Sequence, residues 1–257
     1  MFIAGRQFAF VMLILSMGLV IWALQMARKG KLPFLRKLAA IEAIDQAIGR
    51  AVEMGRPVHL CPGIMELNST YAAEILAGVS ACAYAARLAV RYGAEFIPTV
   101  CYTDTQALLE EAVRVAYFAE GKGEQYKVGT VRYAPATQPY DVFIVGIAST
   151  QRPAANICIG PASQQSTFTL EAMYRVGAMS LGGTARTVMS PIFVGACDYF
   201  LLGEEVLAVG AYVSEDPTAK GSIRGQDLVK YLFAILVLAG SLLVSFGSNI
   251  LITLTRW

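Results

Sequence analysis

Two long runs without a charged residue lie near the two ends of the chain. Residues 7–27 and residues 231–255 contain no Asp, Glu, Lys or Arg. About 20 apolar residues, at a helical rise of about 1.5 Å each, span a hydrocarbon core of about 30 Å. Trp22 and Tyr231 lie toward the ends of these runs, where interfacial aromatic residues are common. The pattern predicts one transmembrane helix over 7–27 and another over 231–255.

Basic residues flank both runs on the side of the intervening chain. Arg28 and Lys29 follow the first run and Lys230 precedes the second, whereas only Arg6 and Arg256 lie on the outer sides. Because basic flanks stay cytoplasmic, we expect a two-pass protein of the cell (inner) membrane, with residues 28–230 in the cytoplasm and both termini outside. The first run exceeds the about 7–15 apolar residues of a signal peptide, which favours an uncleaved anchor over a cleaved leader.

Between the two runs, helical periodicity alternates with short apolar stretches. Residues 38–54 place apolar side chains at helical spacing, and 58–61 form a short apolar run that ends at Pro62 and Gly63. The same reasoning predicts helices over 71–92, 104–120 and 163–176, and strands over 95–101, 127–133, 142–148, 156–159 and 178–181. Apolar strands that alternate with helices favour an α/β fold, a mostly parallel sheet flanked by helices, in one domain over 28–230.

The expected helix over 71–92 is unusually poor in charge. It carries only Glu74, Arg87 and Arg91, and it is rich in Ala, Gly, Ser and Cys. Three interpretations stay open: a central helix packed on the sheet, a contact between subunits, or a third membrane span. Arg87 interrupts the apolar run and argues against the third.

Composition narrows the class of protein. Charged residues make up 16% of the 257 residues, against about 25% in a typical soluble domain, and the mean hydropathy is +0.52. The net charge of +2 implies no nucleic-acid partner. The cysteines are five in number, far apart along the chain and without a CxxC pair, which favours reduced, buried thiols over disulfides or a zinc site (Cys61, Cys82, Cys101, Cys158 and Cys197).

Recognisable catalytic motifs are missing from the sequence. There is no GxSxG, no GxxxxGK[ST] and no GxGxxG, and His59 is the only histidine. A lone histidine inside an apolar strand is more often a hydrogen-bonded core residue than a catalyst, although the catalytic interpretation stays open. The sequence therefore predicts no metal site and no cofactor.

Loops that follow expected strands offer candidate ligand sites. Ligands of doubly wound sheets bind beside such loops, so 62–70 is one candidate. Gly160 and Ser163 follow one strand, and Gly183, Thr184 and Arg186 follow another. Backbone N–H groups beside an arginine suit a phosphate or carboxylate. The alternative for both segments is an ordinary turn, with a solvated arginine in the second.

Three acidic residues lie in the apolar stretch 192–213. Asp198, Glu204 and Glu205 are candidates for acid/base chemistry, because acids in an apolar environment often mark function. One alternative is an intramembrane acid. Another is a strand, a turn at Gly203 and a helix whose first turn carries Glu204 and Glu205.

Four segments carry a resemblance to a known family. They are GRAVEMGRPVHLCPG (49–63), IGPAS (159–163), GGT (182–184) and ACDYFLLGEEVLAVGAYVSEDP (196–217). Together they resemble an uncharacterised family of prokaryotic membrane proteins, a domain of unknown function with terminal transmembrane segments. The resemblance implies an architecture and no mechanism. It ranks as positions to test Arg50, Glu53, His59, Gly183, Thr184, Asp198, Glu204 and Glu205.

Small and polar residues recur along the second apolar run. Ser241, Ser245, Ser248 and Asn249 form a stripe that suits helix–helix contact in lipid, either with the first run or with another subunit. We therefore expect the lipid bilayer and a second copy of the chain as partners. The leading hypothesis is a non-enzymatic, self-associating assembly or scaffold protein. The alternative is a membrane-tethered enzyme or sensor that binds a small anionic metabolite.

Overall fold

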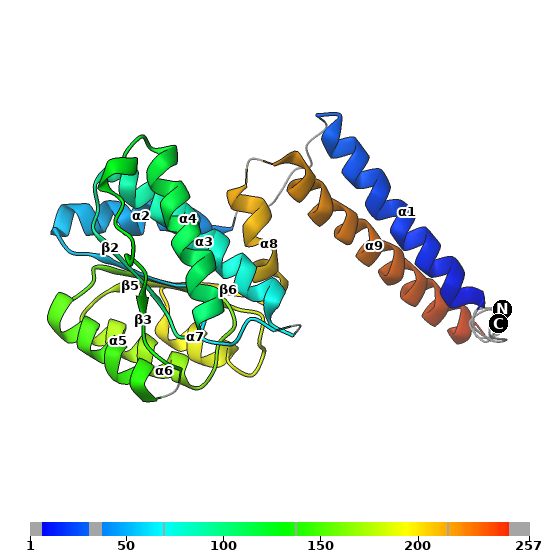
Figure 1. The fold of residues 1–257 in the computed structure, drawn as a ribbon. Helices are drawn as coiled ribbons and strands as arrows, with labels where there is room; N and C mark the ends of the chain where they lie inside the picture. The colour runs from blue at the N-terminus through cyan, green and yellow to red at the C-terminus, as the bar shows by residue number, and fades with distance from the viewer. Residues whose placement is uncertain (1–6, 31–37, 69, 137, 215, 247–257) are drawn as a thin grey trace. The chain divides into compact units, whose positions relative to one another are not determined.

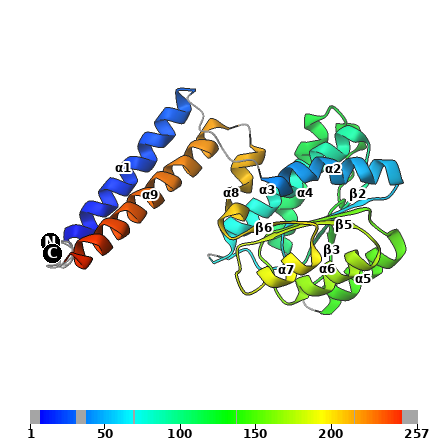
Figure 2. The same cartoon turned by 180° about the vertical axis from the view of Figure 1, so that it is seen from behind.

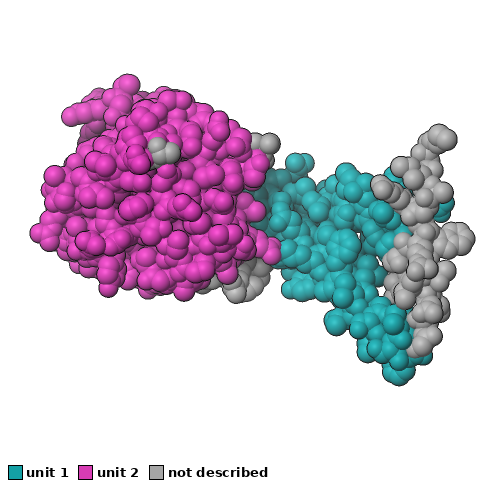
Figure 3. Space-filling model, turned by 90° about the horizontal axis from the view of Figure 1, so that it is seen from below, with its two compact units in different colours: residues 1–35, 214–257 teal, residues 36–213 magenta. Residues whose placement is uncertain are grey.

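A parallel six-stranded sheet is the centre of the computed structural model. The strand order is β3-β2-β1-β4-β5-β6, and every pair is parallel. The strands are β1 Val58–Cys61, β2 Phe96–Val100, β3 Arg132–Tyr133, β4 Ala155–Ile159, β5 Met179–Thr184 and β6 Tyr199–Leu202. The structure describes residues 7–30, 38–68, 70–136, 138–214 and 216–246. The chain divides into two units, unit 1 of residues 1–35 with 214–257, and unit 2 of residues 36–213 (Figure 3).

Helices cover both faces of the sheet in unit 2 (Figures 1 and 2). One face carries α2 Ala39–Met54, α3 Ala72–Tyr92, α4 Thr103–Ala119 and α8 Glu204–Val213. The other face carries α5 Gln138–Gln151, α6 Gln165–Arg175 and α7 Ser190–Ala196. A short 3₁₀ helix, η1 Gly123–Gln125, follows α4. The expected α/β class and parallel sheet are confirmed.

The central strands β1, β2 and β4 are buried at every position. Alternate side chains of these strands therefore point to opposite faces of the sheet and belong to two different hydrophobic cores. Leu60 and Ile157 belong to the core under α2, α3 and α4, whereas Ile97 and Cys158 belong to the core under α5, α6 and α7. Double-sided burial explains why these strands are continuously apolar instead of alternating with polar residues.

Two of the strands predicted from the sequence, over 127–133 and 142–148, differ from the structure. Residues 142–148, expected as a strand, lie inside helix α5. Tyr140, Ile144 and Ile147 are buried at helical spacing while Val142 and Val145 are exposed, so the apolar run covers both sides of a helix. The strand expected over 127–133 is confined to Arg132 and Tyr133.

Three described helices are long and apolar enough to cross a membrane by length and composition, where the sequence predicted two. They are α1 Gln7–Arg28, α3 and α9 Pro217–Ser245. For α3, 67% of the apolar window is buried, against 6% for α1 and 0% for α9. Helix α3 packs on the sheet and against α4 and α8, so the interpretation as a central helix is confirmed.

Unit 1 is an antiparallel pair of helices, α1 and α9. Small residues form the contact: Ala23 and Ala27 on α1 are buried, as are Gly221 and Gly225 on α9. A Cβ added at Gly221 would lie 2.6 Å from Ala27 Cβ, and one added at Gly225 would lie 2.9 Å from Val20 Cα. Such small-xxx-small spacing allows close backbone approach between helices in lipid.

This pairing sets the register of the two apolar runs. Helix α9 begins at Pro217, and its first half contains Lys220, Arg224, Asp227 and Lys230, whereas α1 carries no charge before Arg28. Because Ala27 lies beside Gly221, the charged half of α9 stands beside the uncharged residues of α1. Residues 217–230, expected in the cytoplasmic domain, are thus part of the long C-terminal helix.

Candidate functional site

The sheet places a candidate crevice at the carboxyl ends of β1 and β4. These neighbouring strands are followed by helices on opposite faces, α3 and α6, so the strand order reverses between them. Ligands of doubly wound sheets bind at this switch point. The loops at issue are 62–71 after β1 and 160–164 after β4.

The chain itself fills this crevice. The backbone N–H of Ile64 donates to the carbonyl of Pro161 at 2.9 Å. Gly160 has a φ of +144°, and a Cβ there would lie 2.0 Å from the carbonyl oxygen of Pro62. Gly78 of α3 packs against the same two strand ends, because a Cβ added there would lie 2.2 Å from the carbonyl oxygen of Ile159. The glycines thus serve close packing of two loops and a helix.

A buried carboxylate ties α3 to the end of β5. Glu74 is 6% exposed and accepts hydrogen bonds from Thr184 Oγ1 at 2.9 Å and from the Ala185 N–H at 2.6 Å. A buried charge is tolerated when donors of this kind satisfy it. Glu74, which the sequence showed only as one of three charges in the helix over 71–92, therefore joins the first turn of α3 to the end of β5.

Arg186 joins three of the strand-end loops. Its Nη1 donates to the carbonyl of Ala162 at 2.5 Å, and its guanidinium lies 5.6 Å from the centre of the Tyr71 ring. Ser163 lies two residues before the start of α6, and its Oγ accepts a hydrogen bond from the Gln165 N–H at 3.3 Å. The structure therefore brings Ser163, Thr184 and Arg186 to one edge. Arg186 supplies a cation at this edge.

The other predicted site residues do not join this cluster. Gly183 lies inside β5, which ends at Thr184, and a Cβ at Gly183 would lie 3.0 Å from Leu201 Cβ. Asp198 is exposed and accepts from the Ser180 N–H at 2.8 Å, before β6 begins. Glu204 and Glu205 lie after β6, at the other end of that strand from Asp198. The four residues of β6 span about 13 Å, at about 3.3 Å per residue, so the acids are far apart. The prediction of a strand, a turn at Gly203 and a helix is confirmed.

His59 stands in a buried hydrogen-bond ladder across four strands. Its ring is fully buried, with Nδ1 2.7 Å from Asn156 Oδ1 and Nε2 2.8 Å from Thr99 Oγ1. An amide oxygen only accepts, so Nδ1 donates and Nε2 accepts from the threonine hydroxyl. Tyr140 and Ser180 extend the ladder at either end. Burial lowers the pKa of His59 to about 4, so the ring is neutral at pH 7 and serves the core.

The five cysteines are free thiols, and four of them are buried. Cys61 and Cys158 are direct neighbours in the register of β1 and β4. Burial raises the pKa of the Cys82 and Cys101 thiols, and it raises that of Cys197 to about 12, so these thiols are protonated at neutral pH. Within the described ranges, no group of three or more His, Cys, Asp or Glu side chains is placed to hold a metal ion.

In unit 1 the contact residues differ from the predicted stripe. Ser241 and Ser245 are exposed, and Ser245 Oγ donates to the carbonyl of Ser241 at 2.9 Å, while Ser248 and Asn249 lie outside the described residues. Gly221 and Gly225 make the contact instead. Their GxxxG spacing is visible in the sequence, but it precedes the uncharged run that defined the expected span.

Comparison with known proteins gives one family match. A family model described as a domain of unknown function (DUF6754) matches residues 1–255. No curated protein and no solved structure matches the sequence. The match spans both units, and it confirms the resemblance to an uncharacterised family.

Proposed function

The chain belongs to the family of the domain of unknown function DUF6754, and we propose that it is a membrane-anchored assembly protein that self-associates. One observation carries the proposal. Helices α1 and α9 pair through small residues while their large apolar side chains stay exposed, for example Leu13 at 56% and Ile235 at 64%. Water would disfavour such a surface, whereas bilayer hydrocarbon accommodates it. Unit 2 would be tethered at the inner, cytoplasmic face of the cell membrane.

The surface proposed for self-association lies on the face of unit 2 that carries α5, α6 and α7 (Figure 1). Tyr140 anchors α5 to the sheet, while Val142 and Val145 on its other side are 74% and 47% exposed. Phe168 on α6 and Val194 on α7 are 53% and 54% exposed, and α7 carries no charge. A second copy would cover apolar side chains of this kind, as in homodimer interfaces.

Replacing Val142 by Asp is expected to weaken self-association at least about tenfold, because an unpaired carboxylate would be buried in the interface. The measurement is analytical ultracentrifugation of the full chain in density-matched detergent over a wide concentration range. Val115→Asp is the matched control, since Val115 is 52% exposed on α4, on the opposite face of the sheet. A monomeric wild-type chain at all concentrations would contradict the proposal.

The edge built around Arg186 favours a second candidate function, binding of a small anionic metabolite. The guanidinium lies over Tyr71, beside the two loops that fill the switch point and not inside it, and it is the cation that the strand-end loops offer to an anion. A ligand at about 100 times its Kd would stabilise the folded chain by about 2.7 kcal/mol, which raises Tm by several degrees. We expect Arg186→Ala to abolish that shift and Arg175→Ala, on the exposed side of α6, to retain it. If no anionic metabolite of a broad panel shifts Tm, this candidate fails.

A further inference from the structure

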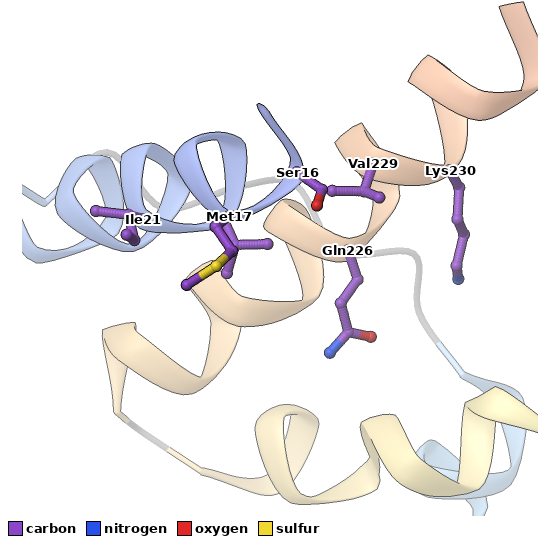
Figure 4. Close-up of a pocket in the computed structure, with 7 residues that line it drawn as sticks. Ser16, Met17, Ile21, Gln226, Val229 and Lys230 are labelled. Atoms are coloured by element: carbon purple, nitrogen blue, oxygen red, sulfur yellow. The ribbon is translucent and has the colours of Figure 1, made fainter. Parts of the chain in front are cut away.

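The pairing of the two helices in unit 1 places apolar residues of α1 level with charged residues of α9. Gly221 of α9 lies against Ala27 of α1, and Gly225 lies close to Val20. The next turn of α9 lines one groove together with α1 (Figure 4): Ser16, Met17, Gln226, Val229 and Lys230. Before Tyr231, α9 carries four charged residues: Lys220, Arg224, Asp227 and Lys230. Because α1 is uncharged before Arg28, its residues 16–27 stand level with the charged half of α9.

A bilayer cannot suit both helices at this level. If hydrocarbon surrounded residues 16–27 of α1, it would also surround the charged side chains of α9, which is costly. If the hydrocarbon instead begins at Tyr231, where the uncharged run of α9 starts, then Ile21 and Trp22 lie on its aqueous side. These two side chains are 50% and 52% exposed, and water disfavours such a surface. Protein therefore covers this part of α1 better than either lipid or water does.

The face of α1 that points away from α9 has the residue spacing of a helix–helix contact. Gly18 lies on the side opposite Ala27, because the two residues are about 2.5 turns apart at about 3.6 residues per turn. A Cβ added at Gly18 has no neighbour within 4 Å among the described residues, so another helix can approach closely here. Exposed residues follow one another on this face at steps of three and four, the spacing of heptad positions a and d: Val11, Ile14, Gly18, Ile21 and Gln25.

We propose that α1 packs against α1 of a second copy of the chain, with the two helices parallel and crossing at Gly18. The face is uncharged and apolar except for Gln25, so it is complementary to itself. Copies anchored in one membrane have the same orientation, and a two-fold axis then brings each residue of the face next to the same residue of the partner. Steps of three and four favour a crossing angle of about 20°.

This inference rests on the proposed function and names a second contact for it. The face of unit 2 that carries α5, α6 and α7 is one surface for self-association, and the free face of α1 in unit 1 is another. A chain with two separate two-fold contacts can form assemblies larger than a dimer, as an assembly protein must.

Disulfide cross-linking of the full chain in lipid vesicles tests the contact between the two α1 helices. Ile14→Cys is expected to form a covalent dimer on oxidation with copper phenanthroline, because a heptad position brings its Cβ close to that of the partner. Leu13→Cys is the matched control. Leu13 and Ile14 are both 56% exposed and lie at the same depth, but Leu13 points about 100° away around the helix. It should cross-link at least about tenfold more slowly. The wild-type chain gives the background from the natural thiols, four of which are buried.

Gly18→Leu is expected to weaken self-association at least about tenfold, because the added side chains hold the two helices apart. The α1–α9 pair should keep its structure in this variant, since Gly18 does not contact α9 and leucine favours a helix. The measurement is analytical ultracentrifugation of the full chain in density-matched detergent, with the wild-type chain for comparison.

Equal cross-linking rates of Ile14→Cys and Leu13→Cys would indicate random collision and would overturn the inference. An unchanged association constant of Gly18→Leu would overturn it as well. If the wild-type chain self-associates while either result is found, the proposed function stands and only the α1 contact is lost. A wild-type chain that is monomeric at all concentrations contradicts the proposed function itself.

Discussion

Gly78→Ala is expected to lower the free energy of unfolding of unit 2 by about 3 kcal/mol, the upper part of the range for overpacked cores. The added Cβ would lie 2.2 Å from the carbonyl oxygen of Ile159 and 2.5 Å from that of Pro62. Both are backbone atoms of the closed switch point, so no side-chain rotation relieves the clash. The helix must move away from the sheet, and the contact between the two loops is lost with it.

Gly49→Ala is the matched control for this substitution. Gly49 also lies inside a helix, α2, but a Cβ there has no neighbour within 4 Å. Alanine in a helix interior is favoured over glycine by about 1 kcal/mol, so this variant should gain stability. Urea unfolding of the full chain in mild detergent, followed by tyrosine near-UV circular dichroism, measures both, since Trp22 and Trp257 belong to unit 1. Equal stability of the two variants would show that the switch point is loosely packed.

Acidification from pH 6.5 to pH 4 is expected to lower the free energy of unfolding of unit 2 by about 3 kcal/mol through His59 alone. Its pKa is lowered from 6.5 to about 4 by burial, and each pKa unit corresponds to about 1.36 kcal/mol. A histidine with a lowered folded pKa stabilises the fold fully above its unfolded pKa, and this stabilisation is lost as pH falls toward the folded pKa. The same urea titration, repeated between pH 7 and pH 4, gives the slope of the free energy of unfolding against pH. The His59→Gln variant should have a smaller slope in this range.

Glu120→Gln serves as the control for the pH experiment. Hydrogen bonds from Arg91 and Arg87 lower the pKa of Glu120 from 4.5 to about 2. Its contribution is therefore lost only as pH falls from about 4.5 toward 2. The variant should keep the slope above pH 4.5. A wild-type chain whose stability is constant from pH 6.5 to 4.5 would mean that His59 is not held neutral in the core.

Much of the fold could be predicted from local pattern. The helix over 38–54, the strands over 58–61 and 156–159 and the helix over 204–213 follow from apolar spacing and from glycine or proline at their ends. The secondary structure of residues 142–148 could not be predicted correctly from the sequence, because a run of seven apolar residues suits a buried strand and a half-exposed helix equally. The tertiary structure decides the case: Tyr140, on the buried side of α5, places its hydroxyl 3.0 Å from Thr99 Oγ1 of the sheet.

The candidate site was only partly predictable. Ser163, Thr184 and Arg186 were candidates because each follows an expected strand, and ligands of parallel sheets bind beside such loops. Glu74 was not expected among them, since it precedes Thr184 by 110 residues and lies on a helix. Nor does the sequence reveal that Pro62 and Gly160 close the crevice, because that contact depends on which strands are neighbours.

The sequence by itself determined the two apolar runs, the charge deficit and the alternation of strands and helices, because each is a property of neighbouring residues. Tertiary structure alone decided the strand order, the burial of α3 and the neutral state of His59, because these depend on contacts between residues tens of positions apart. The same holds for the α1–α9 register. It is set by Ala27 and Gly221, which lie 194 positions apart and touch only when the chain has folded back on itself.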